Sequence, residues 1–152
     1  MSSPTVMVSE GWKAAYPEAR AGILVLSQVA IPVHHAALDQ RKADMETQLR
    51  SQFSGYDRTK LAELPVLQAY NQYYKQFKKT YHVQLQLESI LFKGKSIPNV
   101  AGLVEAMFMA ELQNMLLTAG HDLDALQLPV TVDVAKGDEH YVLINGQEQT
   151  LK

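Results

Sequence analysis

The sequence contains no cysteine, which excludes disulfides, thiolate metal sites and thiol catalysis. It also has no uninterrupted apolar run of the ~18–20 residues that a membrane span requires, because Glu105 and Glu111 break its most apolar stretch. A strong charge of one sign is absent too, and the formal net charge of −2 argues against bulk, nonspecific binding of nucleic acid. The N-terminus lacks a basic region followed by a hydrophobic core, so we expect no secretory signal and a cytoplasmic location.

Several site motifs are missing as well. The Gly-rich phosphate loops GxGxxG and GxxxxGK followed by Ser or Thr are absent, and so is the GxSxG elbow of the α/β-hydrolases. His34 and His35 adjoin at a predicted helix start, so their side chains diverge, and the other histidines are scattered along the chain. The sequence therefore predicts neither a metal site nor a cofactor.

The chain is of ordinary size for one globular domain, with 152 residues of which 47% are hydrophobic. Strand patterns lie near both ends and helix patterns lie between them. This order predicts an α+β fold, with helices packed on a mixed or antiparallel sheet in a single domain spanning residues 1–152. Helices are predicted over 11–16, 34–53, 65–77, 85–92 and 100–119, and strands over 4–9, 21–30, 128–135, 141–144 and 147–152.

Three of these predictions are specific enough to be tested by a structure. Residues 21–30, AGILVLSQVA, are apolar on both faces and predict a buried central strand. The aromatic residues at 70, 73, 74 and 77 follow helical spacing, so we expect them in the core. Lys136-Gly137-Asp138 and Asn145-Gly146 are turn signals that predict two successive hairpins.

Glu105 is the main candidate for chemistry. It lies in an almost wholly apolar helix that we expect to be buried, where a carboxylate should have a raised pKa unless a partner stabilises its charge. Carboxylates with perturbed pKa values often mark functional sites. The alternative is a structural glutamate that pairs with Arg20, caps backbone groups or reaches the surface.

Three further candidates have structural interpretations that we favour. Arg20 lies just before the predicted strand and could anchor a phosphate or carboxylate, but a salt bridge at a strand start is the commoner case. Asn99 could line a pocket, but it is also the expected N-cap of a helix that begins at Val100. His121 beside Asp122 could act as an acid–base pair, although a solvent-exposed loop histidine is more common.

The basic residues are unevenly distributed. Residues 72–95 contain five lysines against one acidic residue, Glu88, so this region predicts a local cationic surface on a mildly acidic protein. The interleaved Tyr74 and Tyr81 could stack on bases while the lysines contact an RNA backbone. Equally, lysines near a helix C-terminus favourably oppose the helix dipole. The five lysines are Lys75, Lys78, Lys79, Lys93 and Lys95.

Three stretches, in this order, resemble the tRNA-binding and editing B3/B4 domain of the phenylalanyl-tRNA synthetase beta subunit and its free-standing relatives. The first is residues 16–22, YPEARAG, which lead into ILVL. The second is Leu64-Pro65 with the aromatic helix through Phe77. The third runs from Ser89 through KGKSIPN and the apolar helix to the DLD of residues 122–124. Together they cover roughly residues 11–145, and their order carries the resemblance.

The resemblance implies a pocket that holds the terminal adenosine and amino acid of a mischarged tRNA, with hydrolysis of the ester by a positioned water. Glu105 is then the expected catalytic residue, and Arg20, Asn99, His121 and Asp122 are expected to bind the substrate. The five lysines would hold the acceptor stem. No metal or nucleophilic side chain is implied.

The chain departs from the family pattern at two positions. Phe108 stands where the family usually has an asparagine, and Ala119 stands where the synthetase form has a histidine. Both changes remove a polar group, so they favour a module that binds tRNA, an amino acid or another small ligand without catalysis. Three readings are therefore open: an aminoacyl-tRNA deacylase, a non-catalytic binding module, or an interaction protein whose last strand completes a partner's sheet.

The end of the chain bears on the third reading. Residues 147–152 would form an edge strand with little sequence after it to cover it. Free-standing members of the resembled family usually continue beyond this point. The sequence is thus a shortened chain, a natural short form, or half of a structure that another chain completes.

Overall fold

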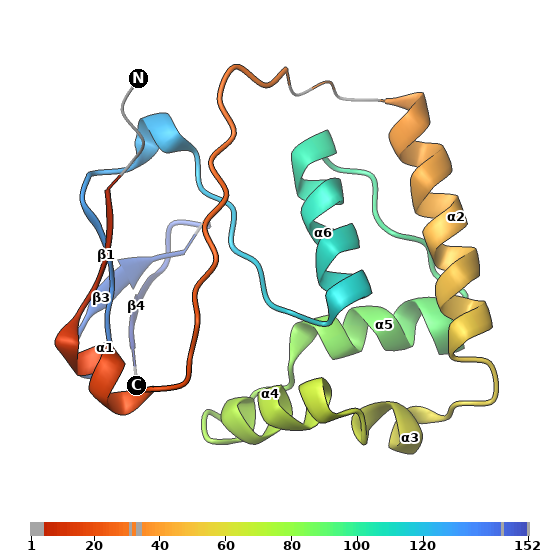
Figure 1. The fold of residues 1–152 in the computed structure, drawn as a ribbon, viewed down its shortest axis with the longest axis horizontal. Helices are drawn as coiled ribbons and strands as arrows, with labels where there is room; N and C mark the ends of the chain where they lie inside the picture. Colours follow the sequence, from red (N-terminus) through yellow and green to blue (C-terminus); the bar gives the residue numbers. More distant parts are fainter. Residues whose placement is uncertain (1–4, 31, 33–34, 144, 152) are drawn as a thin grey trace. The chain divides into compact units, whose positions relative to one another are not determined.

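In the computed structural model, which describes residues 5–30, 32, 35–143 and 145–151, helices and short strands occupy different parts of the chain (Figure 1). The chain divides into two compact units: a helical unit, Val29–Gly120, and a strand unit, Met1–Gln28 with His121–Lys152. The fold class is α+β, as predicted, while the single domain stays a prediction. Four residues of predicted elements lie outside the described ranges: Pro4, His34, Ile144 and Lys152.

The helices of the helical unit begin and end at residues whose local chemistry favours a boundary. The Asp57 side chain caps α3 by accepting from the Lys60 N–H at 2.8 Å. Pro65 opens α4, where a missing N–H costs nothing, and Gly94 closes α5 with a left-handed φ of 65°. The helices are α2 (Ala36–Gln52), α3 (Arg58–Ala62), α4 (Pro65–Lys75), α5 (His82–Lys93) and α6 (Gly102–Asn114).

The core of the helical unit lies where α2, α5 and α6 pack on one another, and α3 packs on α4 (Figure 1). The predicted helices over 34–53, 65–77 and 85–92 are confirmed as α2, α4 and α5, with small shifts at their ends. Burial of these apolar side chains is the main driving force for folding of this unit. The buried hydrophobic residues are Leu49, Phe53, Leu61, Leu67, Tyr81, Val83, Leu87, Ile90, Ile97, Met109 and Leu112.

Helix α6 is shorter and less buried than its sequence predicts. It begins two residues after Val100 and ends at Asn114, where Met115 adopts a left-handed φ of 56°. Only one face is buried, and Val104 is 39% exposed. The prediction that this helix is buried therefore holds for one face only, because apolar composition shows that a helix can be covered but not how many neighbours cover it.

The segment after α6 is held by side chains of other helices. The Tyr81 hydroxyl donates to the Met115 carbonyl at 3.0 Å, and burial raises the pKa of this phenol. The Tyr70 hydroxyl accepts from the Leu117 N–H at 3.2 Å. At Gly120 a Cβ would lie 2.6 Å from Met107 Sδ, so glycine permits a close approach to α6 rather than ending the helix.

The strand unit contains two small two-stranded sheets. In one, β1 (Val6–Val8) pairs in parallel with β2 (Val130–Val132), and Val6 aligns with Val130. In the other, β3 (His140–Val142) pairs antiparallel with β4 (Glu148–Thr150). Helix α1 (Glu10–Ala15) follows β1, capped by the Ser9 side chain, and a 3-10 turn, η1 (Leu123–Ala125), precedes β2.

Two strand predictions are wrong in the strand unit. The predicted first hairpin does not form, because β2 pairs with β1 instead of β3, whereas the second hairpin at Asn145-Gly146 is confirmed by β3 and β4. Residues 21–30 form no strand and are exposed, with Leu24 at 82%. Their apolar pattern is suited to a strand covered on both faces, but no described strand pairs with them.

Candidate functional site

Glu105 lies in a buried polar cluster between α2 and α6. Lys42 of α2 approaches it, with 2.5 Å between Lys42 Nζ and Glu105 Oε2, and the two residues are only 5% and 4% exposed. Lys42 Nζ also lies 3.0 Å from Asp39 Oδ1 on its own helix. Of the structural alternatives for Glu105, pairing with Arg20 is wrong, because the cation that neutralises Glu105 is Lys42.

Asn99 belongs to the same cluster but does not cap α6. Its side-chain oxygen accepts a hydrogen bond from Lys42 Nζ, and the N-cap position is occupied by Ala101, whose side chain makes no capping bond. Glu105 instead reaches back to the segment before the helix, where its Oε1 accepts from the Val100 N–H at 2.9 Å. The predicted cap at Asn99 is wrong because the helix begins further along the chain.

The charges in this cluster are mutually stabilised. The hydrogen bond from Lys42, followed by that from the Val100 N–H, holds the pKa of Glu105 below its ordinary value of 4.5. Burial alone would lower the pKa of Lys42, but its bonds to Glu105 and Asp39 outweigh burial and raise the pKa above 10.5. Glu105 is therefore ionised and engaged on both oxygens, an arrangement suited to a structural ion pair and poorly suited to a general acid.

Two further buried carboxylates, which sequence reasoning did not single out, act in a similar way. Glu46 accepts from the Ile97 N–H at 2.8 Å, and Glu111 accepts from the Thr118 N–H and hydroxyl, both at 2.9 Å. In the sequence, each of them is only a glutamate on a helix with an apolar residue one or two turns away. Many exposed glutamates have the same pattern, so sequence alone does not distinguish the buried ones. With Glu105, they attach irregular segments of backbone to α2 and α6.

The remaining predicted substrate-binding residues belong to the strand unit. Arg20 is exposed, and its guanidinium donates to the Ala19 carbonyl at 3.3 Å. His121 is exposed, and the Asp122 side chain caps η1 by accepting from the Asp124 N–H at 3.1 Å. The structure therefore joins Glu105 and Asn99 through Lys42 in the helical unit, while Arg20, His121 and Asp122 remain predictions.

The predicted lysines form two groups at opposite ends of α5, which has 12 residues and is thus ~18 Å long. Lys93 and Lys95 lie at its C-terminal end. The other three lie at the last residue of α4 and in the segment between it and the start of α5. All five lysines are exposed. The group at the end of α4 is Lys75, Lys78 and Lys79.

Exposed aromatic rings accompany the lysines of α4. Tyr73 and Phe77 are 44% and 45% exposed, and their ring centroids lie 5.3 Å apart. Tyr70, in contrast, stacks on Tyr81 with the centroids 4.1 Å apart, and Tyr81 is fully buried, so the predicted stacking of a base on Tyr81 is wrong. The prediction that the aromatic residues at 70, 73, 74 and 77 all lie in the core is therefore wrong for Tyr73 and Phe77. Together with Lys75, Lys78 and Lys79 these two rings form what we call the basic–aromatic end of α4.

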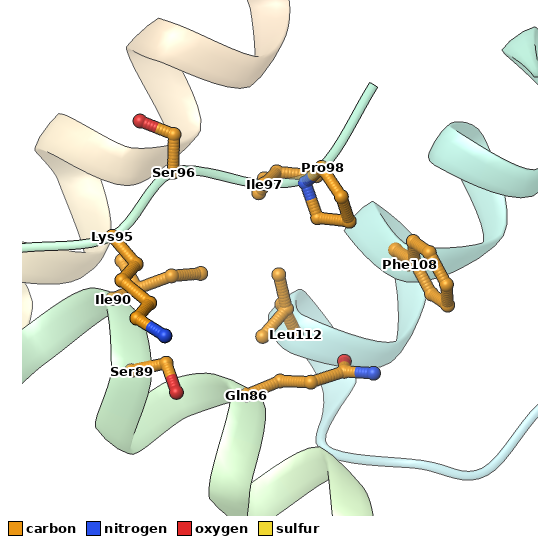
Figure 2. A pocket seen from close by; sticks show the side chains of 9 residues that line it. All are labelled: Gln86, Ser89, Ile90, Lys95, Ser96, Ile97, Pro98, Phe108 and Leu112. Atoms are coloured by element: carbon orange, nitrogen blue, oxygen red, sulfur yellow. The ribbon is translucent and has the colours of Figure 1, made fainter. Parts of the chain in front are cut away.

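A small cavity of about 270 Å³ lies in the helical unit between α5, the segment 95–98 and α6 (Figure 2). Glu105 does not line it, whereas Lys95 and Phe108 do. Phe108 thus presents an aromatic ring to a cavity at the position where the resembled family has an amide. The lining residues are Gln86, Ser89, Ile90, Lys95, Ser96, Ile97, Pro98, Phe108 and Leu112.

Comparison with protein-family models, curated proteins and solved structures yields no match to this chain. Within the described ranges, no three His, Asp or Glu side chains gather as a metal site would require. In the same ranges, every helix is too short or too polar to cross a membrane.

Proposed function

We propose that this chain is a B3/B4-like module that binds tRNA and does not hydrolyse its aminoacyl ester. The proposal includes the finer description of the fold, a single B3/B4-like domain with helices packed on a sheet. The observation that carries it is the basic–aromatic end of α4, where exposed lysines and exposed rings lie within a few residues of one another. The order of the three motifs supports tRNA as the class of RNA.

The chemistry of the basic–aromatic end suits a single-stranded RNA end. Lysine ammonium groups contact phosphates and release counterions, which makes binding dependent on salt. Exposed tyrosine and phenylalanine rings stack on bases regardless of sequence, with ~1–3 kcal/mol per stacked base. Because the whole chain has a net charge of −2, binding should depend on this local surface and not on overall attraction.

The proposal excludes hydrolysis because the carboxylate of Glu105 is not available to a substrate. A residue that orients water or binds an α-amino group must present a carboxylate oxygen to the substrate. Both oxygens of Glu105 are already engaged, one by Lys42 and one by the Val100 N–H. Phe108 and Ala119, which replace polar residues of the family pattern, act in the same direction.

The test of RNA binding is the salt dependence of affinity. Fluorescence anisotropy measures the binding of a deacylated tRNA, and we would repeat it from about 50 to about 200 mM salt, around physiological ionic strength. These data give the slope of the logarithm of the binding constant against the logarithm of the salt concentration. The double variant Lys78→Glu/Lys79→Glu should bind more weakly, with a slope reduced by about 1.4–1.8, because two phosphate contacts are lost. The matched control Lys60→Glu/Lys136→Glu has the same net charge but alters exposed lysines elsewhere, and it should bind like the unaltered chain.

The absence of catalysis is tested with tyrosyl-tRNA(Phe). Ester loss should proceed at the spontaneous rate in the presence of the protein. An acceleration that disappears in Glu105→Gln would instead establish the deacylase reading and give Glu105 its catalytic role. If tRNA does not bind at all, or if the control variant weakens binding as much as the test variant, the proposal is wrong. The hypothesis of an interaction protein, whose last strand completes a partner's sheet, is then favoured.

A further inference from the structure

The cavity between α5, the segment 95–98 and α6 has the composition of a small-molecule site. Ile90, Ile97, Pro98, Phe108 and Leu112 supply apolar walls, and Figure 2 shows their side chains around one hollow. Ligand sites are commonly concave and apolar with a few polar groups that fix orientation. At about 270 Å³ the cavity is slightly smaller than a typical drug-sized site, so it suits a ligand with one ring or a branched aliphatic group.

Gln86 provides the first polar group. Its Oε1 is the one buried side-chain oxygen or nitrogen of the described residues that has no hydrogen-bond partner. In Figure 2 its amide extends toward Phe108 and Leu112, along the cavity. The neighbouring Gln84 is different, because its oxygen accepts from Asn71 at 2.6 Å and its nitrogen donates to Glu88 at 2.9 Å. A buried acceptor without a donor is unfavourable, and a ligand N–H or O–H would relieve it.

Lys95 provides the second polar group, on the Ser89 side of the cavity (Figure 2). Its side chain is exposed and takes no part in the ion pairs found among the described residues. Its backbone is fixed on both sides: the Lys95 N–H donates to the Ser89 carbonyl at 3.0 Å, and the Lys95 carbonyl accepts from Arg50 Nη2 at 3.2 Å. A flexible ammonium on a fixed backbone can meet an anionic group at the mouth of the cavity.

We infer that this cavity binds a small monocarboxylate with an apolar or aromatic body and a hydrogen-bond donor at the far end. The carboxylate contacts Lys95, the body lies among Ile97, Pro98, Phe108 and Leu112, and the donor reaches Gln86 Oε1. A phosphate is a poorer fit, because one lysine is the only cation that lines the cavity. The inference does not depend on RNA binding, since no residue of the basic–aromatic end of α4 lines the cavity.

The test uses a set of four probes that differ by one group each. 4-Hydroxyphenylacetate has the carboxylate, the ring and a hydrogen-bond donor, and phenylacetate lacks the donor. 4-Methoxyphenylacetate keeps the carboxylate and the ring, but its ether oxygen can only accept a hydrogen bond. Tyramine keeps the ring and the donor but replaces the anion with a cation. Titrations followed by ¹H–¹⁵N NMR report on the Gln86 side-chain amide and on the Ile97 N–H. The hydroxy acid should bind about tenfold more tightly than phenylacetate and the methoxy acid, because only it satisfies Gln86. Tyramine should not bind.

Two variants link this binding to the proposed contacts. Gln86→Leu should remove the preference for the hydroxyl group while keeping or raising the Tm, because it removes an unpartnered buried oxygen. Lys95→Met should weaken the hydroxy acid at least about fivefold, and the control Lys93→Met, which alters an exposed lysine outside the lining, should not. The inference is overturned if no probe shifts the cavity resonances at millimolar concentration, or if Gln86→Leu and Lys95→Met bind the four probes as the unaltered chain does.

Discussion

The two units of this chain differ in how they are held together. Every buried hydrophobic residue of the described chain lies in the helical unit, between Leu49 and Leu112. In the strand unit no described residue is buried, and each strand has only three residues. Isolated two-stranded sheets are marginally stable at best in water, whereas burial of apolar side chains, as in the helical core, is the dominant favourable term in folding. The comparison indicates that the helical unit contains most of the free energy that stabilises the described chain.

Amide hydrogen exchange is the most direct test of this difference in stability between the two units. Amides of α5, which packs on both α2 and α6, should exchange only when the helical unit unfolds. Amides of β3 and β4 should exchange through local opening, roughly 1000-fold faster at the same pH. Similar protection in β3 and α5, measured by NMR or mass spectrometry, would show that the strand unit is as stable as the helical one.

A second, smaller effect is expected from truncation of one side chain in each unit. Leu67 of α4 is fully buried, so Leu67→Ala should lower the free energy of unfolding by about 2–5 kcal/mol. Val132 of β2 is half-buried, so Val132→Ala should lower it by less than about 1 kcal/mol. Urea titrations followed by helical circular dichroism measure both values, and equal losses would contradict the comparison.

The smallest effect concerns pH and compares one carboxylate from each unit. Hydrogen bonds hold the pKa of Glu105 below 4.5 and, through Ser9 first and then the Val134 N–H, the pKa of Asp133 below 3.8. A lowered folded-state pKa adds stability above the unfolded-state value, and this stability is lost as pH falls through the folded-state value. Both carboxylates should therefore stabilise the chain at pH 7 and lose their effect in acid.

The variants separate the two carboxylates because only Glu105 is buried. Glu105→Gln should lower the Tm at pH 7, and its difference from the unaltered chain should shrink as the pH falls below 4.5. Asp133→Asn, in an exposed position, should change the Tm of the helical signal little at any pH. A Glu105→Gln difference that stays constant between pH 7 and pH 3 would exclude the ion pair with Lys42 as its cause.

Much of the helical unit could be predicted from its sequence because helix ends depend on local chemistry. Asp57, Pro65 and Gly94 each act on backbone groups within a few residues, and the structure has helix boundaries at all three. The periodic spacing of apolar residues in α4 and α5 likewise needs no distant partner to be recognised. These features explain why α4 and α5 were predicted correctly, although the short helix α3, which Asp57 caps, was not predicted.

The errors concern contacts between residues that are far apart in the sequence. The partner of Glu105 is 63 residues away, in a different helix. Residues 21–30 have the composition of a central strand, but pairing depends on another segment being available. Tyr73 and Phe77 follow the same spacing as buried Leu67, and only the width of the packed face decides which rings are covered.

The contacts of the buried glutamates affect which sequence changes the helical unit can tolerate. Glu46, Glu105 and Glu111 bind main-chain N–H groups of the segments they hold, and every residue except proline offers such a group. An exposed side chain in those segments, such as that of Val100, is thus not needed to anchor its segment, whereas the buried Ile97 side chain and the Thr118 hydroxyl add contacts of their own. Natural variation or laboratory randomisation can change the exposed side chain at Val100 while the attachment through its N–H persists.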